Sequence, residues 1–344
     1  MNNISRDNHL VPQMYLRAWE YKDCMIHVYD LLVPNKKCNE WKNRKAKGIA
    51  YQRDFYTNVE NAKEEDYLEK IFNEKYETPA KEPLTKAING DKLDSDDWSK
   101  LIDFIGIQII RTKARALEIL KISKSVLERD MPNELNKIVG KLSDENVNIK
   151  KLNKEKRRLD SKVEKFKMPL EGQIEDYDND KKILKVEATM GKGLYLYMLN
   201  DNEVKDVLNI LHRHKWQVID ITNNISIPTS DDPVIRLQYC SKDEYNFNGG
   251  INQKGVNIIF PISPNKIIYT QVGYGKKVQF NEEFSIFIKK IIVEHAYRHI
   301  YSCNDDDQIK KIRKREVDKA KFDKEKKIEN TYIESYKKYA MENF

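Results

Sequence analysis

His9-Leu-Val-Pro-Gln-Met-Tyr-Leu-Arg17 follows only eight residues of largely polar sequence, and the rest of the chain is interpreted around it. Chain termini usually fray unless tertiary contacts hold them. Here a histidine, a proline, a glutamine, a tyrosine and an arginine stand close together among apolar residues. This density is typical of a buried segment beside a functional site, and we expect the N-terminus to be held in that way.

Strand and helix patterns alternate in the segment that follows. Residues 25–30 alternate and favour a short strand, with a return strand within 38–41. From 64 to 89 apolar residues recur every three or four positions, which predicts a helix. Pro79 and Pro83 are expected to kink or break it.

A second helix is predicted from an N-cap at Ser95 to about Leu127, with its middle buried around 104–110. Residues 131–167 mix charges of both signs and predict either an exposed helical insertion or a mobile one. One or two further helices are expected over 185–211.

In the second half of the chain the spacing of apolar residues changes to the alternation that is typical of strands. A hairpin is expected between 216–221 and 225–227, turning at Asn223-Asn224. Further strands are predicted at 234–239, 255–261 and 266–272, followed by a helix over 280–302 and a long charged helix over 305–344.

These patterns predict an α+β fold. We expect a helical N-terminal half with a small N-terminal hairpin, an antiparallel sheet in the C-terminal half and a long charged C-terminal helix. The expected division is a single α+β domain over 1–302, with a charged helical insertion at 131–167, and a charged helical tail over 303–344.

Composition narrows the cellular setting. Lys and Arg number 62 and Asp and Glu 55, giving a net charge of +7 that favours nucleic-acid partners only weakly. The four cysteines form no CxxC pair, so reduced thiols are expected. Neither a signal peptide nor a membrane-spanning stretch is recognised. We expect a cytoplasmic protein with no membrane partner, and the C-terminal helix could support a homo-oligomer.

His9 and Gln13 are the first candidate site residues. Histidine titrates near neutrality and is the commonest general acid or base, while Gln13 offers a neutral donor and acceptor four residues on. The structural alternative is a buried histidine that bonds a backbone carbonyl and anchors the N-terminus. Residue physics alone favours that alternative.

Gln108, Arg111 and Arg115 form a polar stripe on the most apolar helix. A buried arginine is rare unless paired, and its guanidinium suits a phosphate or a carboxylate. The structural alternative is an ion pair with Glu69 or Glu77.

Asp231 lies in the segment Thr229-Ser-Asp-Asp-Pro233 between two predicted strands. It could bind a metal, orient His9 or accept a proton, although a turn rich in Asp, Ser and Pro needs no function. Glycine-rich phosphate loops and zinc-protease patterns are lacking, and the pair His212 and His214 is a weak metal signal.

Several segments together resemble an uncharacterised bacterial family, domain of unknown function 4238. In chain order, these segments are His9-Leu-Val-Pro-Gln-Met-Tyr-Leu-Arg17, Asp54-Phe-Tyr56, 69–77, Phe104-Ile-Gly-Ile-Gln-Ile-Ile-Arg-Thr112 with Arg115, Thr229-Ser-Asp-Asp-Pro-Val234, Phe260-Pro-Ile-Ser-Pro264 and 296–302. The chain departs from the family pattern at Trp19, where Phe is usual, and at Lys113, where Pro often stands.

The resemblance implies an antiviral-defence effector without establishing its chemistry. The motif residues from distant segments make a shared site more plausible than separate structural roles. Our hypothesis is a nuclease that cleaves a phosphodiester bond, with RNA favoured. His9, Arg111 and Asp231 are the expected catalytic residues.

In this hypothesis His9 transfers protons, Arg111 holds the phosphate, and Asp231 orients His9 or holds a metal. Gln13, Tyr15, Gln108 and Arg115 are the expected substrate-binding residues. No cofactor is required, and a divalent metal stays an alternative. The rival hypothesis is a non-catalytic sensor or binding module that recognises a phage protein or a nucleotide.

Overall fold

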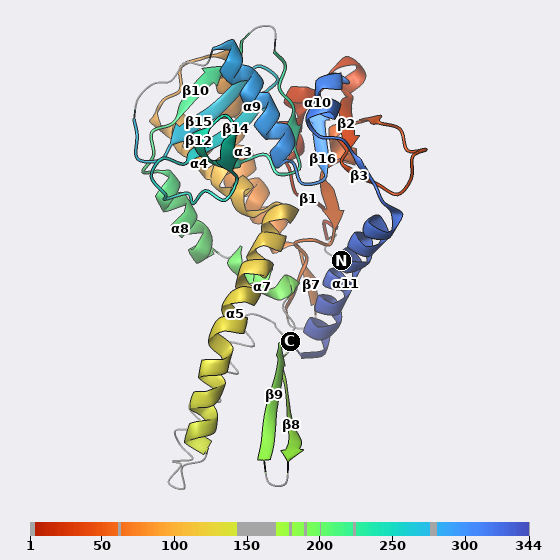
Figure 1. The fold of residues 1–344 in the computed structure, drawn as a ribbon. Coiled ribbons are helices and arrows are strands. Elements are labelled where there is room, and N and C mark those ends of the chain that lie inside the picture. The colour runs from red at the N-terminus through yellow and green to blue at the C-terminus, as the bar shows by residue number, and fades with distance from the viewer. Residues whose placement is uncertain are drawn as a thin grey trace. The chain divides into compact units, whose positions relative to one another are not determined.

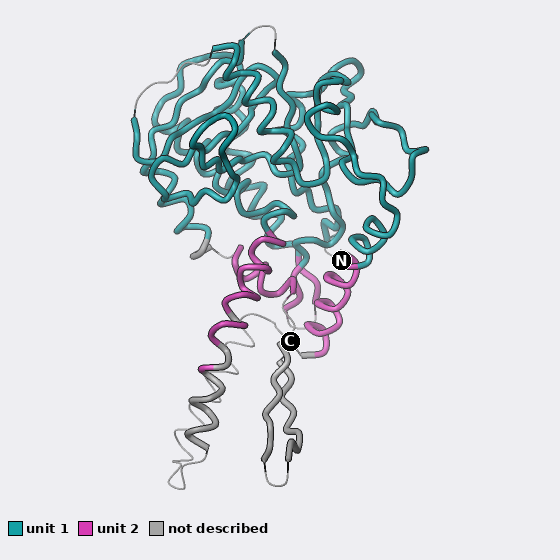
Figure 2. The backbone as a smooth tube through the Cα atoms, in the orientation of Figure 1, with its two compact units in different colours: residues 1–57, 66–115, 201–327 teal, residues 58–65, 116–200, 328–344 magenta. Residues whose placement is uncertain are grey.

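Figure 1 shows the computed structural model, which describes residues 4–60, 63–142, 170–178, 181–188, 191–199, 201–222, 225–275 and 281–343. The chain divides into two compact units (Figure 2). Unit 1 comprises residues 1–57, 66–115 and 201–327, and unit 2 comprises 58–65, 116–200 and 328–344. These boundaries differ from those of the domain over 1–302 and the tail over 303–344 that we expected. That division stays a prediction.

An antiparallel sheet of five strands lies in unit 1. Its order is β10 (Gln217–Asp220), β15 (Lys266–Gln271), β14 (Asn257–Ser263), β12 (Ile235–Ser241) and β13 (Glu244–Asn246). Every residue of β14 is buried, because helices cover both of its faces (Figure 1). Ile259 packs with α9 (Glu282–His295) on one side. Phe260, the next residue, contacts Phe104 of α4 (Ser95–Ile110) on the other.

The hairpin expected at Asn223-Asn224 is wrong. Strand β10 pairs with β15, placing Asp220 opposite Lys266. The backbone of Ile227 is bonded elsewhere, since its N–H donates to the Pro264 carbonyl and its carbonyl accepts from the Trp19 indole. Residues 223 and 224 themselves lie outside the described residues.

A second sheet of unit 1 joins β11 (Thr229–Ser230), β16 (His299–Ser302), β2 (Ile26–Asp30) and β4 (Trp41–Arg44). Strand β2 confirms the strand predicted at 25–30. The helix expected over 280–302 ends at His295, because Ala296 leaves the helical region at ψ 139° and the chain then enters β16.

The first helical segment runs through its two prolines. It comprises α2 (Tyr67–Ile71), a π-helical turn η4 (Phe72–Glu77) and α3 (Thr78–Asn89). The π-helical turn η4 directly precedes α3, so the residues before Pro79 are already helical, and the segment continues past both prolines without a break.

The second helix differs from its prediction at both ends. Asp94, not Ser95, is the N-cap of α4, and Asp94 and Asp97 form a reciprocal capping box. The helix ends at Ile110, and α5 (Lys113–Leu142) begins after a break at Arg111 and Thr112. Lys113 is thus the first residue of a helix.

Short elements complete unit 1. Those at the N-terminus are β1 (Asp7–His9), α1 (Gln13–Leu16), η1 (Arg17–Trp19), η2 (Lys22–Cys24), β3 (Leu32–Val33), η3 (Ala46–Gly48) and β5 (Tyr51–Arg53). Later ones are α8 (Asp201–Leu211), α10 (Asp307–Ile312) and β17 (Glu316–Val317), which pairs with β3 in parallel. The tail expected as one helix over 305–344 therefore starts with α10 and β17, and the long α11 (Lys319–Asn343) follows.

Unit 2 contains the hairpin β6 (Asn58–Glu60) and β7 (Lys63–Glu65), α7 (Lys192–Met198), the hairpin β8 (Leu170–Asp178) and β9 (Lys181–Ala188), and the later parts of α5 and α11. The start of the helix expected over 185–211 is therefore strand. Of the insertion expected at 131–167, residues 131–142 are helical and the rest lies outside the described residues. Among the residues that the structure describes, no helix is both long and apolar enough to cross a membrane.

Candidate acid–base site on the N-terminal ribbon

The site is built on the two-stranded ribbon of β1 and β5, in which His9 lies opposite Tyr51 and Asp7 opposite Arg53. Side chains of paired residues share one face of a ribbon, and neighbours along each strand point the other way. Asn8 points inward, is fully buried and accepts the Tyr56 N–H at 2.8 Å. His9 and Tyr51 therefore lie together on the opposite face, with ring centroids 5.8 Å apart.

The main chain of His9 is held from both sides. Arg111 Nη2 donates to the His9 carbonyl oxygen, and the Glu69 carboxylate accepts the His9 N–H. Arg111 Nη1 in turn donates to Glu77 Oε1 at 2.6 Å. Because both peptide groups of His9 are bonded, the direction of its side chain is set by residues of α2, η4 and the end of α4.

The imidazole of His9 contacts one side-chain amide and one backbone carbonyl. His9 Nε2 lies 3.2 Å from Gln13 Nε2, and the ring also bonds the backbone carbonyl of Lys47. An amide nitrogen donates its hydrogen bond, so a neutral imidazole accepts from Gln13 through Nε2. Burial lowers the pKa of His9, and the charge of Arg111 lowers it further, against raising contributions from Lys47, Glu77 and Asp7. A neutral His9 at pH 7 has its basic nitrogen facing Gln13.

Arg111 is fully enclosed. Its guanidinium lies 4.8 Å from the Phe72 ring centroid and 5.7 Å from that of Tyr56. Burial disfavours its charge, but Glu77, Tyr56 and Glu69 outweigh this, so the pKa of Arg111 is raised. The ion pair with Glu77 that we considered as the structural alternative is thus present, and the guanidinium has no exposed surface on which to hold a phosphate.

Glu69 is the second titratable group of the site. Burial raises its pKa to about 7; Glu77 adds to this effect, while Arg111 and the His9 N–H oppose it. Its Oε2 atom is buried without a hydrogen-bond partner among the described residues. The carboxyl group therefore changes its protonation near neutral pH while bonded to the backbone of His9.

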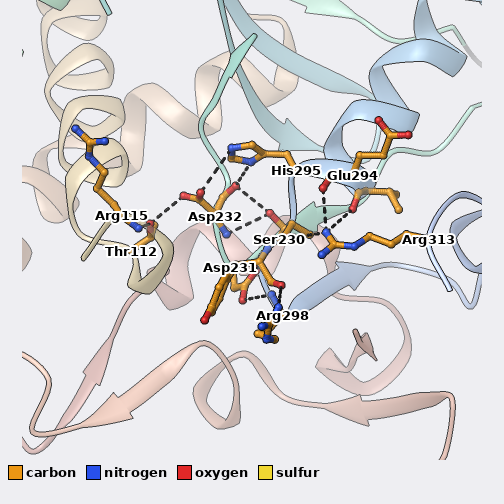
Figure 3. Close-up of polar contacts among 12 residues, drawn as sticks. Thr112, Arg115, Ser230, Asp231, Asp232, Glu294, His295, Arg298 and Arg313 are labelled. Carbon is orange, nitrogen blue, oxygen red and sulfur yellow. Dashed lines mark hydrogen bonds and ion pairs between the residues drawn. The ribbon is translucent and has the colours of Figure 1, made fainter. Parts of the chain in front are cut away.

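Asp231 makes contacts other than the ones we expected (Figure 3). Its carboxylate accepts the N–H groups of Tyr297 and Arg298 at 2.9 and 2.8 Å, at the turn between α9 and β16. The neighbouring Asp232 accepts from Thr112 Oγ1 at 2.9 Å and lies 3.6 Å from His295 Nε2. Asp231 is therefore bonded to this turn and not to His9, and it is Asp232 that accompanies a histidine.

The model of the family described as "Protein of unknown function (DUF4238)" matches residues 7–306. The chain belongs to the DUF4238 family. No curated protein and no solved structure matches it significantly.

The match to DUF4238 includes every residue that we expected in the site. The structure brings Gln13 of α1 and Arg111 at the end of α4 against His9 of the ribbon. Tyr15 is fully buried, with its hydroxyl between Thr229 Oγ1 at 2.6 Å and the Pro261 carbonyl at 2.8 Å. Gln108 is also fully buried, and its amide atoms have no hydrogen-bond partner among the described residues.

Arg115 lies in the first turn of α5, and its N–H donates to Thr112 Oγ1 at 3.3 Å, the hydroxyl that bonds Asp232. Tyr15, Gln108 and Arg115 stay predictions as substrate-binding residues. The first two have no exposed side-chain surface.

Sequence reasoning missed Lys47 and Tyr51, which complete the surroundings of His9. The signal for Tyr51 was its alternation with Gln52 and Arg53, which is typical of a half-exposed strand. Within the described ranges, no group of three or more His, Cys, Asp or Glu side chains is arranged to hold a metal ion.

Proposed function

We propose that this DUF4238 protein is a cytoplasmic nuclease of bacterial antiviral defence that cleaves phosphodiester bonds, with RNA as the favoured substrate and His9 as its general base. The observation that carries the proposal is the state of His9. An imidazole with a lowered pKa lies on the outer face of a ribbon, with Nε2 beside Gln13, and the main chain of His9 is held by Arg111 and Glu69. This is the preparation that a general base requires.

In the proposed reaction, His9 Nε2 takes the proton of a 2′-hydroxyl group, whose oxygen attacks the adjacent phosphorus atom. The bond to the 5′ oxygen breaks, and this oxygen leaves with a proton from solvent. Gln13 gives up its contact with Nε2 and bonds a substrate oxygen. Arg111 acts through the His9 backbone and is a positioning residue, which revises the phosphate-holding role expected from the sequence.

The test is cleavage of end-labelled RNA and DNA by the wild-type chain, with and without divalent metal. His9→Gln is expected to abolish cleavage, while His212→Gln, a change at a half-exposed histidine paired with Asp103, is expected to retain it. Activity is expected to rise with pH through a pKa below 6.5, because His9 acts in its neutral form. Cleavage by a folded His9→Gln protein contradicts the proposal.

The rival proposal is a non-catalytic sensor that recognises a phage protein or a nucleotide. A structural role of His9 is a separate alternative, and its contact with Gln13 Nε2 fits an imidazole that anchors the N-terminus. Phage protection that depends on His9, with no cleavage of any nucleic acid by the wild-type chain, would support the sensor. Failure of His9→Gln to fold would support a structural role.

A further inference from the structure

We infer that residues 41–53, named here the basic strip, bind single-stranded RNA, with Tyr51 stacking on a base and the exposed cations contacting phosphates. The inference rests on the proposed function, because it takes the bound RNA to be the substrate that is cleaved at His9. It goes further by naming the form of nucleic acid that the site accepts and the residues that bind it.

Charge is the first argument. The basic strip holds five cations, Lys42, Arg44, Lys45, Lys47 and Arg53, and no carboxylate, whereas charges of both signs are nearly balanced in the whole chain. Lys42 is paired with Asp30 across β2 and β4. The other four are exposed, and the side chain of Arg53 is 71% exposed. A cluster of this sign in the immediate surroundings of a general base attracts a polyanion.

The position of the cations relative to His9 is the second argument. Lys47 supplies the carbonyl that His9 bonds, so the strip passes directly beside the imidazole. Arg53 lies on the same ribbon face as His9, two cross-strand pairs further along. Two carboxylates reduce the local charge, since Asp7 opposes Arg53 on this face and Asp54 Oδ2 lies 3.8 Å from Arg53 Nε, but four exposed cations outnumber them.

Tyr51 is the third argument, and it decides between single and double strands. Its side chain is 45% exposed although it sits beside His9 at a ring-centroid distance of 5.8 Å. Proteins that bind single strands combine a cationic track with aromatic rings on which bases stack. Bases inside a duplex are already stacked on each other and do not reach such a ring. Two residues along a strand span about 6.6 Å, so Tyr51 and Arg53 can contact a base and a neighbouring phosphate of one extended strand.

The test is fluorescence anisotropy with labelled single-stranded 2′-O-methyl RNA, which lacks the nucleophilic hydroxyl group, and the full wild-type chain. Tyr51→Ala is expected to weaken binding by roughly 5- to 100-fold, the range for loss of one base–aromatic stack. Tyr51→Phe should retain binding. Tyr274→Ala is the matched control, since Tyr274 is also half-exposed, at 50%.

Salt dependence tests the cations. Each of Lys45→Gln, Lys47→Gln and Arg53→Gln is expected to reduce the slope of log affinity against log salt by about 0.7. Lys319→Gln on α11, an exposed lysine outside the strip, should leave the slope unchanged. Melting curves establish that each variant is folded.

Three results would overturn the inference: binding unaffected by Tyr51→Ala, duplex RNA bound as tightly as the single strand, or no binding of RNA with Tyr51-dependent binding to vesicles of anionic phospholipid. The outcome is separable from that of the proposed function. Tyr51-dependent RNA binding without cleavage would support the inference about the basic strip and contradict the proposed nuclease. His9-dependent cleavage with unchanged RNA binding by Tyr51→Ala would support the nuclease and contradict the inference.

Discussion

Glu77 compensates the most enclosed charge of the N-terminal site, because Arg111 has no contact with solvent. Glu77→Gln is expected to lower the free energy of unfolding by about 3 kcal/mol, the lower end for breaking a buried ion pair, because Glu69 stays close to Arg111. Denaturant titration measures the change. Glu74→Gln, in the same π-helical turn but exposed, is the control, and equal stabilities of the two variants would contradict a compensating role for Glu77.

The raised pKa of Glu69 makes stability depend on pH. Its pKa is 4.5 in an unstructured chain and about 7 in the folded protein, so the folded state binds the proton more tightly. The stabilisation from this proton is complete below pH 4.5 and is lost as pH rises through 7, to a total of at most about 3 kcal/mol. Glu69→Gln is expected to flatten the fall in melting temperature between pH 5 and pH 8. An unchanged pH profile would show that Glu69 does not titrate in this range.

The sequence could indicate some of these residues and not their contacts. A buried arginine needs a partner, so Arg111 with Glu69 or Glu77 was a sound expectation, and the structure places both carboxylates around it. That Arg111 bonds the backbone of His9 depends on how β1 lies against α4, which no local pattern encodes. The sequence could not assign the roles of Asp231 and Asp232 either. These neighbours lie in one turn, yet Asp231 bonds the Arg298 N–H and Asp232 bonds the Thr112 hydroxyl.

At the scale of elements, side chains of α8 pack directly against Gly106 of α4. A Cβ atom there would lie 2.3 Å from Leu208 Cδ2 and 3.2 Å from Leu211 Cδ1. Gly106→Leu is therefore expected to destabilise the protein by roughly 1–3 kcal/mol through overpacking. Adding Leu208→Ala frees volume and should restore part of the loss, and thermal melting of the single and double variants measures it. Destabilisation by Gly106→Leu that Leu208→Ala worsens would show that this contact is not the cause.

The ends of elements were harder to predict than their existence. The apolar spacing of α4 continues past Arg111 into α5, so periodicity alone predicted one helix to about Leu127. The break is made by tertiary contacts, since the Tyr56 hydroxyl donates to the Arg111 carbonyl at 2.5 Å and Thr112 bonds Asp232. Asp94 and Ser95 are both good N-caps, and only the bonds received by Asp94 distinguish them.

For the whole molecule, the α+β class followed from the change of period between the two halves, and the long C-terminal helix is confirmed in α11. The division into two units could not be predicted from the sequence pattern. Unit 2 is assembled from three separate stretches of chain, and contacts between such stretches leave no local sequence pattern.

Tyr336 of α11 tests how unit 2 is assembled. Its hydroxyl donates to Asn58 Oδ1 at 2.5 Å and accepts the Val59 N–H at 3.4 Å, and its pKa is raised to about 12 by burial. Tyr336→Phe removes both bonds and keeps the ring that lies against Lys192. A hydrogen bond contributes about 0.5–1.5 kcal/mol, so amide exchange in β6 should accelerate roughly 2- to 10-fold.

Hydrogen exchange followed by mass spectrometry measures this change for peptides covering β6 and β7. Exchange in β1 should be unaltered, because the lost bonds lie within unit 2 and His9 belongs to unit 1. Acceleration in β1 equal to that in β6 would show that the two units open together, and Tyr336 would then act on the whole protein. Acceleration confined to β6 and β7 would mean that a contact of the C-terminal helix, more than 270 residues away in sequence, sets the local stability of this hairpin.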